Sequence, residues 1–249
     1  LELHLQATSS CALIQLLLAK LPCVESVNIR AEDTADMHTA KRWPQPPRDS
    51  LPEPIARLSK LATLSLDIAD DALLTAFELP ALRSLCLRNS ALAVSYLERA
   101  LQLAPNLTSL SMSSALDSNC GVRMRAVCDP PLSRLTTVRL PSFPWPDDDF
   151  ACLLKSAPSL LELQVEGQLA QRVLPSVQMP RLRMVEFIPD RKVNKALHGK
   201  AVAGMLRSCP RLGRLLAAAH HPTPADLNEL VAAFKGQTRA VGFEIAGLF

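Results

Sequence analysis

Hydrophobic residues recur along the chain in one short phrase, which ends in two apolar residues separated by a polar one. The phrase reads P-x-(L/V)-x-x-(L/V)-x-(apolar), as in "LPALRSLCL" at 79–87. It returns in "APNLTSLSM" at 104–112, "APSLLELQV" at 157–165, "MPRLRMVEF" at 179–187 and "CPRLGRLLA" at 209–217. Alternation of apolar and polar residues is the period of a β-strand with one buried face. Each copy therefore predicts a short strand that follows a proline turn.

The copies are separated by similar lengths of chain. Aligned on the first apolar residue of the phrase, they begin at Val24, Leu61, Leu82, Leu107, Leu135, Leu160, Leu182 and Leu212, with a degenerate copy at Thr238. Most spacings fall between 21 residues (Leu61 to Leu82) and 30 residues (Leu182 to Leu212), which is the range of leucine-rich repeats. The longer first spacing indicates an insertion. Each copy is expected to supply one strand of a parallel stack.

Between several strands the apolar period changes to 3.6 residues, the period of an amphipathic helix. Four sets of apolar residues follow i, i+3, i+4, i+7 and end just before a proline, which disfavours further helix. They are Ile14, Leu17, Leu18 and Leu21; Leu97, Ala100, Leu101 and Ala104; Phe150, Leu153, Leu154 and Ala157; and Val202, Met205, Leu206 and Cys209. The copies at 61–82 and 160–182 are too short for a long helix. There we expect a single turn or an extended segment on the outer side.

This pattern resembles the leucine-rich repeats of the ribonuclease-inhibitor-like superfamily, and the phrase "(A/C)P(N/S/R)L" is most similar to the repeat arm of F-box proteins. The resemblance covers nearly the whole chain. It implies an α/β fold, a right-handed leucine-rich-repeat solenoid or horseshoe with a parallel sheet on its concave side and helices on its convex side. We expect residues 1–249 to form a single such domain of about nine repeats, as a fragment of a longer chain.

Composition and charge exclude several classes of function. The chain is 48% hydrophobic and 20% charged, which is typical of a folded protein. Its net charge of +3 is too small to favour nucleic acid or an anionic membrane. The longest apolar run, "CALIQLLLA" at 11–19, is too short to span a membrane. The seven cysteines form no CxxC pair or zinc-binding spacing, and their odd number favours a reducing compartment. We expect a soluble cytoplasmic or nuclear protein.

No pattern of catalytic or cofactor-binding residues stands out. P-loop, GxGxxG, HExxH and GxSxG motifs do not occur in the sequence, so we expect no enzyme, cofactor or metal. Asp147 to Asp149 could form a cation site, but they directly precede a helical stripe. We favour their interpretation as N-cap and first-turn acids that complement the helix dipole.

The outward positions of the predicted strands are the first candidate binding surface. They are small and polar with mixed charge, which suits a protein or peptide ligand, although an ordinary solvated face has the same composition. The outward positions are Ser26, Asn28, Arg30, Thr63, Ser65, Asp67, Ser84, Cys86, Arg88, Ser109, Ser111, Ser113, Thr137, Arg139, Glu162, Gln164, Glu166, Met184 and Glu186. The candidate contact residues among them are Asn28, Arg30, Arg88, Arg139, Glu162, Glu166 and Glu186.

The second candidate surface is a rim of longer insertions that follow the strands, at 33–54, 115–131, 141–149 and 188–195. Two of them contain the tryptophans of the chain, Trp43 and Trp145. Trp and Arg are the residue types that most often anchor interfaces, so Arg42, Arg123 and Arg125 join the candidates. The alternative is that each tryptophan folds back over the end of the apolar core.

The resemblance also implies a function. It implies the substrate-recognition arm of an F-box type ubiquitin ligase adaptor, which would recruit a cullin and its F-box adaptor through a missing upstream segment. The alternative is a regulatory or sensor scaffold with no ubiquitin link, such as a signalling scaffold, a GTPase regulator or an immune receptor arm. Residues upstream of Leu1 would separate the two.

Overall fold

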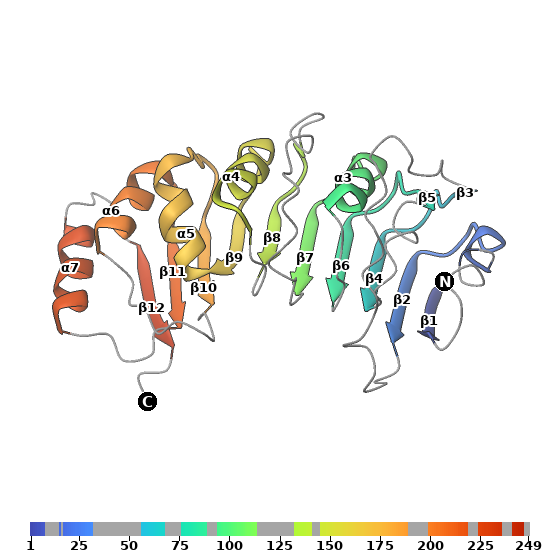
Figure 1. The fold of residues 1–249 in the computed structure, drawn as a ribbon, viewed down its shortest axis with the longest axis horizontal. Helices are drawn as coiled ribbons and strands as arrows, with labels where there is room; N and C mark the ends of the chain where they lie inside the picture. The colour runs from blue at the N-terminus through green and yellow to red at the C-terminus, as the bar shows by residue number, and fades with distance from the viewer. Residues whose placement is uncertain are drawn as a thin grey trace. The chain divides into compact units, whose positions relative to one another are not determined.

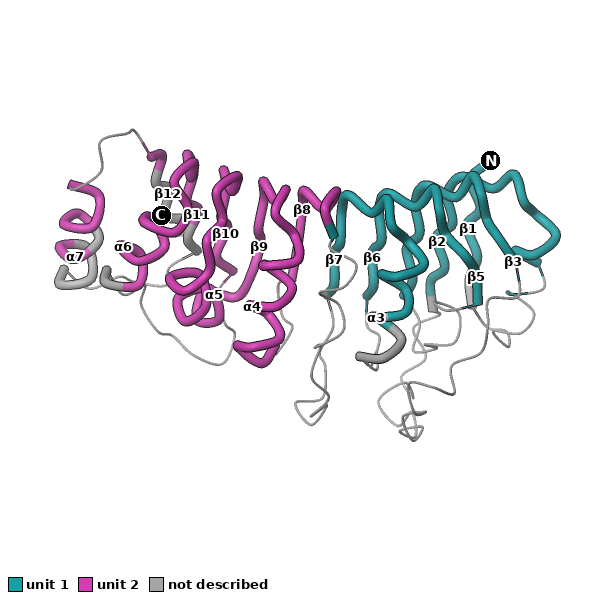
Figure 2. Tube along the Cα trace, turned by 90° about the horizontal axis from the view of Figure 1, so that it is seen from above, with its two compact units in different colours: residues 1–132 teal, residues 133–249 magenta. Residues whose placement is uncertain are grey.

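The protein has an α/β fold in which parallel strands alternate with helices. A computed structural model describes residues 1–7, 15, 17–31, 56–67, 76–88, 94–113, 132–140, 145–188, 199–218, 224–235 and 241–246. The chain divides into two compact units, Leu1–Leu132 and Ser133–Phe249 (Figure 2). We call them unit 1 and unit 2.

Unit 1 is built on a parallel sheet whose strands follow one another in chain order (Figure 1). These strands are β1 (Glu2–Ala7), β2 (Ser26–Ala31), β4 (Thr63–Asp67), β6 (Ser84–Arg88) and β7 (Ser109–Ser113). Helix α3 (Val94–Leu103) connects β6 to β7. Two short strands, β3 (Ala56–Arg57) and β5 (Phe77–Glu78), pair in parallel as a separate small sheet.

Unit 2 repeats the same arrangement, with more helix among the described residues. Its parallel strands, also in chain order, are β8 (Thr137–Leu140), β9 (Glu162–Glu166), β10 (Met184–Ile188), β11 (Arg214–Ala218) and β12 (Gly242–Ala246). Its helices are α4 (Asp147–Ser156), α5 (Gly167–Val173), α6 (Gly199–Ser208) and α7 (Pro224–Lys235), and a 3₁₀ turn, η3 (Leu174–Ser176), follows α5. Figures 1 and 2 show α4, α5 and α6 on one side of the strands.

The alternation predicted for the strands is confirmed. Leu85 of β6 lies in register with Leu64 of β4 and Leu110 of β7, and all three are buried. The first apolar residue of each phrase, from Val24 to Leu212, is also buried. The residues between the two strand leucines are half-buried or exposed. Because a shift of one residue would turn every leucine outward, this pattern fixes the register.

A recurring pair of backbone hydrogen bonds joins each strand to the one before it. The amides of Arg83 and Ser84 both donate to the carbonyl of Ala62, at 2.8 and 3.0 Å. The amides of Thr108 and Ser109 donate to the carbonyl of Arg83 in the same way, both at 2.8 Å. These bonds hold successive strands at a constant offset.

The helical stripes are confirmed in α3, α4 and α6, where every predicted residue is buried. The first set is wrong in part: Leu18 is buried, but Leu17 exposes 38% of its surface and Leu21 is half-buried. Ile14 lies outside the described residues. Periodicity predicts which face of a helix turns inward, but it does not predict whether a neighbouring element covers the whole of that face.

The two short copies use different outer segments. Between β4 and β6, the described outer segment is β5, which is extended as expected. Between β9 and β10, α5 has seven residues, about two turns, and η3 follows it, so this connection is more helical than predicted. In both copies the amide of the residue before the proline bonds to the last residue of the helix that follows in the chain. Leu79 N donates to Leu103 O of α3 at 3.1 Å, and Met179 N donates to Ser208 O of α6 at 2.9 Å.

The last copy lies two residues later than the alignment on Thr238 predicts. The register pairs Phe243 with Leu215 and Ile245 with Ala217. Because side chains alternate with a period of two, the shift keeps the same residues on the same face. Thr238 itself lies outside the described residues.

Candidate protein-binding surface

The outward face of each unit consists of the side chains at the first, third and fifth strand positions, opposite to the buried leucines. In unit 1 the third positions of β4, β6 and β7 carry small polar groups. Ser65 lies beside Cys86, and Cys86 lies beside Ser111, in one row across the sheet. All three are half-buried. Such short side chains leave the sheet surface open to a ligand that follows its contour.

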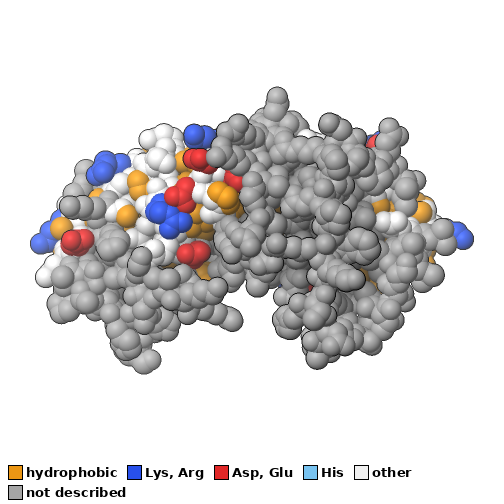
Figure 3. Space-filling model, viewed as in Figure 1, with side chains coloured by type: hydrophobic (Ala, Val, Ile, Leu, Met, Phe, Trp, Pro, Cys, Tyr) orange, Lys and Arg blue, Asp and Glu red, His pale blue; other side chains and the backbone are white. Residues whose placement is uncertain are grey.

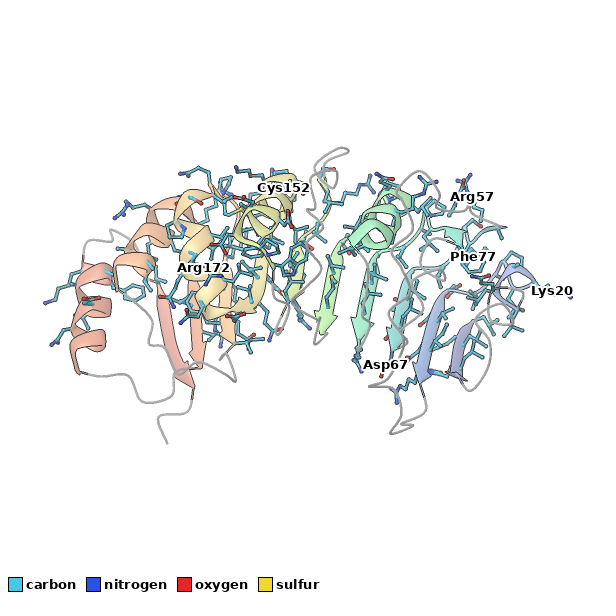
Figure 4. The ribbon with its side chains drawn as sticks, viewed as in Figure 1. Lys20, Arg57, Asp67, Phe77, Cys152 and Arg172 are labelled. Carbon is cyan, nitrogen blue, oxygen red and sulfur yellow. The ribbon has the colours of Figure 1, made fainter. Side chains whose placement is uncertain are left out.

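Three charged residues of unit 1 lie at fifth strand positions. Arg30 of β2 is in register with Asp67 of β4. Arg88 of β6 comes directly after Leu87, which is in register with Leu66 of β4. Both arginines are exposed, whereas Asp67 is half-buried at the end of β4 (Figure 4). The buried Oδ1 atom of Asp67 has no hydrogen-bond partner in the described part of the chain. The candidate residues Asn28, half-buried, and Arg30 and Arg88, exposed, therefore lie on one face of unit 1.

The outward face of unit 2 has two rows of side chains across the sheet. The first-position row runs Thr137, Glu162, Met184 and Arg214. The third-position row runs Arg139, Gln164, Glu186 and Leu216. Arg139 and Arg214 are exposed, and the other six side chains are half-buried. The structure thus brings the predicted residues Arg139, Glu162 and Glu186 together on one surface.

Three charged candidates of this face, Arg139, Glu162 and Glu186, do not neutralise one another. No ion pair or side-chain hydrogen bond joins Arg139, Glu162 or Glu186 to any residue that the structure describes. Glu166, at the end of β9, is close enough to Arg172 to favour the charged guanidinium. Of the acidic candidates, Glu162 and Glu186 are thus the two whose charge is available to a ligand.

Trp145 lies in the interior rather than on the rim. It exposes only 5% of its surface, and its ring is tilted against that of Phe150 with 6.5 Å between the ring centroids. The structure therefore favours the alternative in which this tryptophan covers the core, and it removes Trp145 as an exposed contact. Trp43, Arg42, Arg123 and Arg125 lie outside the described residues.

An ion pair that the sequence did not predict joins two helices of unit 2. Arg172 of α5 donates to Asp147 of α4: Nε is 3.0 Å from both carboxylate oxygens, and Nη2 is 3.0 Å from Oδ1. The hydrogen bonds that Arg172 donates to this carboxylate raise the pKa of Arg172 above its ordinary value, although burial opposes this effect. Basic and acidic side chains lie side by side over α4 and α5 (Figure 3), and Arg172 extends from α5 (Figure 4). The residues are 25 apart in sequence, so no local pattern could reveal the pair.

The acidic run Asp147 to Asp149 therefore has a structural role. All three residues lie in the first turn of α4, as predicted, where they complement the helix dipole. The N-cap, however, is Pro146 and not an aspartate, and it makes no side-chain cap bond. Over the described residues, no group of three His, Cys, Asp or Glu side chains could hold a metal ion.

The cysteines differ in their state. Cys23, Cys86 and Cys209 form no disulfide, and Cys209 is buried directly after α6, as the helical stripe predicts. Cys152 of α4 is disulfide-bonded. Disulfides are rare in reducing compartments, so this bond departs from the compartment that the cysteine pattern predicts. None of the helices described is long and apolar enough to cross a membrane.

No protein-family model matches the chain, and no curated protein matches it. The functional argument therefore rests on the residues of the chain itself.

Proposed function

We propose that the chain is a leucine-rich-repeat solenoid, a right-handed horseshoe that binds a protein or peptide ligand on its outward sheet faces. The observation that carries the proposal is the pattern around each strand. Ser65, Cys86 and Glu186 face outward, and the two residues that flank each of them are apolar and buried. The sheet thus offers a surface that the helices do not cover.

Two features support a repeating solenoid. Strands that are adjacent in the sequence are adjacent in the sheet within each unit, which is what stacking of successive repeats produces. The same pair of amide donors also recurs from one copy to the next, at Arg83 and Ser84 and again at Arg183 and Met184. Each repeat therefore contacts its neighbours in an equivalent way.

The chemistry of the outward faces supports a protein or peptide ligand. The face of unit 1 contributes hydroxyl groups and two exposed arginines, and that of unit 2 contributes charges of both signs beside Met184 and Leu216. A polyanion such as nucleic acid would instead require a continuous basic surface. Polar groups interspersed with apolar side chains are typical of protein interfaces.

The proposed biological role is that of the substrate-recognition arm of an F-box type ubiquitin ligase adaptor in the cytoplasm or nucleus. It rests on the similarity of the phrase "(A/C)P(N/S/R)L" to the repeat arm of F-box proteins. In this role the outward faces select the substrate, and a separate upstream segment recruits the cullin through its adaptor. The chain itself performs no catalytic step.

Affinity purification with variants tests both parts of the proposal. The full-length parent and the present chain serve as parallel baits in their own cells. The variant Ser65→Arg/Ser111→Arg obstructs the outward face of unit 1, and Gln102→Arg places the same group on the exposed side of α3. Proteins recovered with the wild type and with Gln102→Arg, but not with the double variant, would support ligand binding on this face.

The two parts of the proposal give distinguishable results. Recovery of a cullin and its adaptor by the parent, but not by the chain alone, is expected for a ligase arm. Their absence from both baits would contradict the ubiquitin role and leave a scaffold or sensor. Capture that Ser65→Arg/Ser111→Arg leaves unchanged would contradict binding on the outward face of unit 1.

A further inference from the structure

The outward face of unit 2 contains a junction between an acidic and an apolar area. Glu162 of β9 lies beside Met184 of β10, and Glu186 of β10 lies beside Leu216 of β11. Strands in a sheet are about 4.8 Å apart and residues along a strand about 3.3 Å. Glu162 and Glu186, which are diagonal neighbours, therefore have Cα atoms about 8 Å apart. Both carboxylates can reach one cation placed between them.

Neither Glu162 nor Glu186 pairs with a residue that the structure describes, and both are half-buried. The neighbouring Arg214 takes part in an interaction of its own. Half-buried carboxylates lose part of their hydration, so an incoming cation would interact with them more strongly than with fully solvated carboxylates.

The apolar side of the junction suits the stem of a basic side chain. Lys and Arg lay their methylene groups along apolar surface while the charged end reaches polar groups. Met184, beside Glu162, and Leu216, beside Glu186, are half-buried and provide such a surface. The distance from the midpoint of the two acidic strands to β11 is about one and a half strand spacings, or about 7 Å. This equals the separation of residues i and i+2 in an extended peptide, whose side chains point the same way.

A third group sets the order in which the residues of the ligand lie across the strands. Arg139 of β8 is exposed at the opposite end of the third-position row, about 7 Å from the same midpoint. It repels a basic residue and attracts an acidic one. An extended peptide that crosses the strands would therefore meet Arg139, then the acidic pair, then Leu216.

We propose that the outward face of unit 2 binds an extended peptide segment with the pattern (Asp/Glu)-x-(Lys/Arg)-x-(apolar). Its basic residue lies between Glu162 and Glu186, its apolar residue lies on Leu216, and its acidic residue faces Arg139. This inference rests on the proposed function, because it specifies the ligand of one of the proposed binding faces. It follows from the complementarity of charge and apolar surface across β8 to β11.

The test uses a random twelve-residue peptide library displayed on phage and selected against the whole chain. Selection by the wild type should enrich a Lys or Arg two residues from an apolar residue. A synthetic peptide of the enriched sequence should bind Glu162→Gln/Glu186→Gln at least about tenfold more weakly in fluorescence polarisation, because two partners of a charge-assisted contact are lost. Arg139→Glu should remove the preference for the acidic residue and keep the preference for the basic one.

Two controls separate loss of binding from loss of fold. The glutamine variants keep the shape of each side chain, and a circular dichroism melt checks that they fold. Asp148→Lys changes charge on the exposed surface of α4, away from the strands, and should bind the peptide as the wild type does. Equal binding by Glu162→Gln/Glu186→Gln, or enrichment of peptides without basic residues, would overturn the inference.

Failure of this inference can be told from failure of the proposed function. A library that yields no peptide overturns the peptide ligand, whereas the affinity purification described above still reports on folded partners. Partners lost with Ser65→Arg/Ser111→Arg but retained with Glu162→Gln/Glu186→Gln would keep the proposed function and reject the inference.

Discussion

The side-chain amide of Asn106 donates a hydrogen bond to the backbone carbonyl oxygen of Pro80 over 2.7 Å. Asn106 follows Pro105 in the phrase "APNL", and Pro80 opens the preceding copy. The turn of one repeat thus bonds to the turn of the previous repeat. Backbone bonds from Thr108 and Ser109 to Arg83 join the same two repeats three residues further along.

Replacement of Asn106 tests this link between turns. Asn106→Ala should lower the free energy of unfolding by about 0.5–1.5 kcal/mol, the net value of an ordinary hydrogen bond. Ser159 occupies the equivalent position in "APSL" and has no side-chain hydrogen bond to a described residue, so Ser159→Ala should have almost no effect. Urea unfolding followed by circular dichroism compares the two. Equal losses would show that the turn tolerates neither change, and that the bond to Pro80 is not the cause.

Leu85 tests the register of the sheet. Its side chain is 1% exposed and lies between Leu64 and Leu110. Leu85→Ala removes apolar contacts and leaves a cavity, so we expect a loss of about 2–5 kcal/mol. The next residue, Cys86, faces outward, and Cys86→Ser should change stability by less than about 0.5 kcal/mol. Thermal and urea unfolding of both variants give the comparison; similar effects at the two positions would refute the assigned register.

Trp145 distinguishes a core residue from an interface anchor. Because the ring is buried against Phe150, Trp145→Ala should cost about 3–5 kcal/mol, as large-to-small changes in cores do. Trp145→Phe should cost less, because it retains an aromatic ring in the same space. Differential scanning calorimetry measures both. An unchanged melting temperature for Trp145→Ala, together with lost partner capture, would instead restore its interpretation as a contact residue.

The sequence predicted the parts of the fold that depend on local periodicity. Leu85, Leu101 and Met205 are buried because the strand and helix periods place them on the inner face. The same periods do not determine whether a neighbouring element covers the whole of that face, and Leu17 is exposed. The proline turn is an equally local signal, and it marks where strands begin after α4 and α6.

The parts that depend on contacts between distant residues could not be predicted in this way. Arg172 and Asp147 meet because α4 and α5 lie side by side, and neither residue belongs to a motif. The sequence left the orientation of Trp145 open, because a tryptophan beside prolines is compatible both with an exposed rim contact and with a cover over the core. For the outward faces, sequence predicted which side chains point away from the core. The absence of ion pairs at Glu162 and Glu186 among the described residues required the structure.

Gly204 of α6 lies against Pro175 of η3. A Cβ atom added at Gly204 would be 2.8 Å from the Cβ of Pro175, closer than such atoms approach. Alanine has a higher helix propensity than glycine. The overpacking against Pro175 should nevertheless outweigh this gain, so Gly204→Ala should destabilise the protein by about 1–3 kcal/mol. Gly167→Ala is the matched control. Its Cβ would be 3.6 Å from Phe187, an ordinary contact, and the change should be neutral or stabilising by up to about 1 kcal/mol. Stabilisation by both substitutions would show that α6 and η3 can move apart.

The pair of Arg172 and Asp147 is half-exposed, with 51% and 48% of the two side chains accessible. Solvent screening limits such pairs, so a double-mutant cycle with Arg172→Ala and Asp147→Ala should give a coupling energy of about 0.2–1 kcal/mol. The coupling should fall between ~0.1 M and ~1 M salt, because the Debye length shrinks from about 10 to 3 Å. A coupling of zero in low salt would show that the helices are held by apolar packing alone.

The pH dependence of this pair follows from the raised pKa of Arg172. A cation whose pKa is higher in the folded state stabilises the protein fully below the unfolded value, and the stabilisation is lost as pH rises through the folded value. Arginine has the highest ordinary pKa of the basic side chains, so this loss lies in strong alkali. The difference in unfolding free energy between wild type and Arg172→Ala should therefore stay constant between about pH 7 and 10, where arginine remains protonated.

Arg172→Lys should retain only part of the coupling, since a lysine ammonium cannot form the same paired hydrogen bonds. Its contribution should also decline as pH approaches about 10, where lysine begins to lose its proton. Urea unfolding of the three proteins across this range measures both effects, and a parallel decline in the wild type would mean that another group carries the pH dependence.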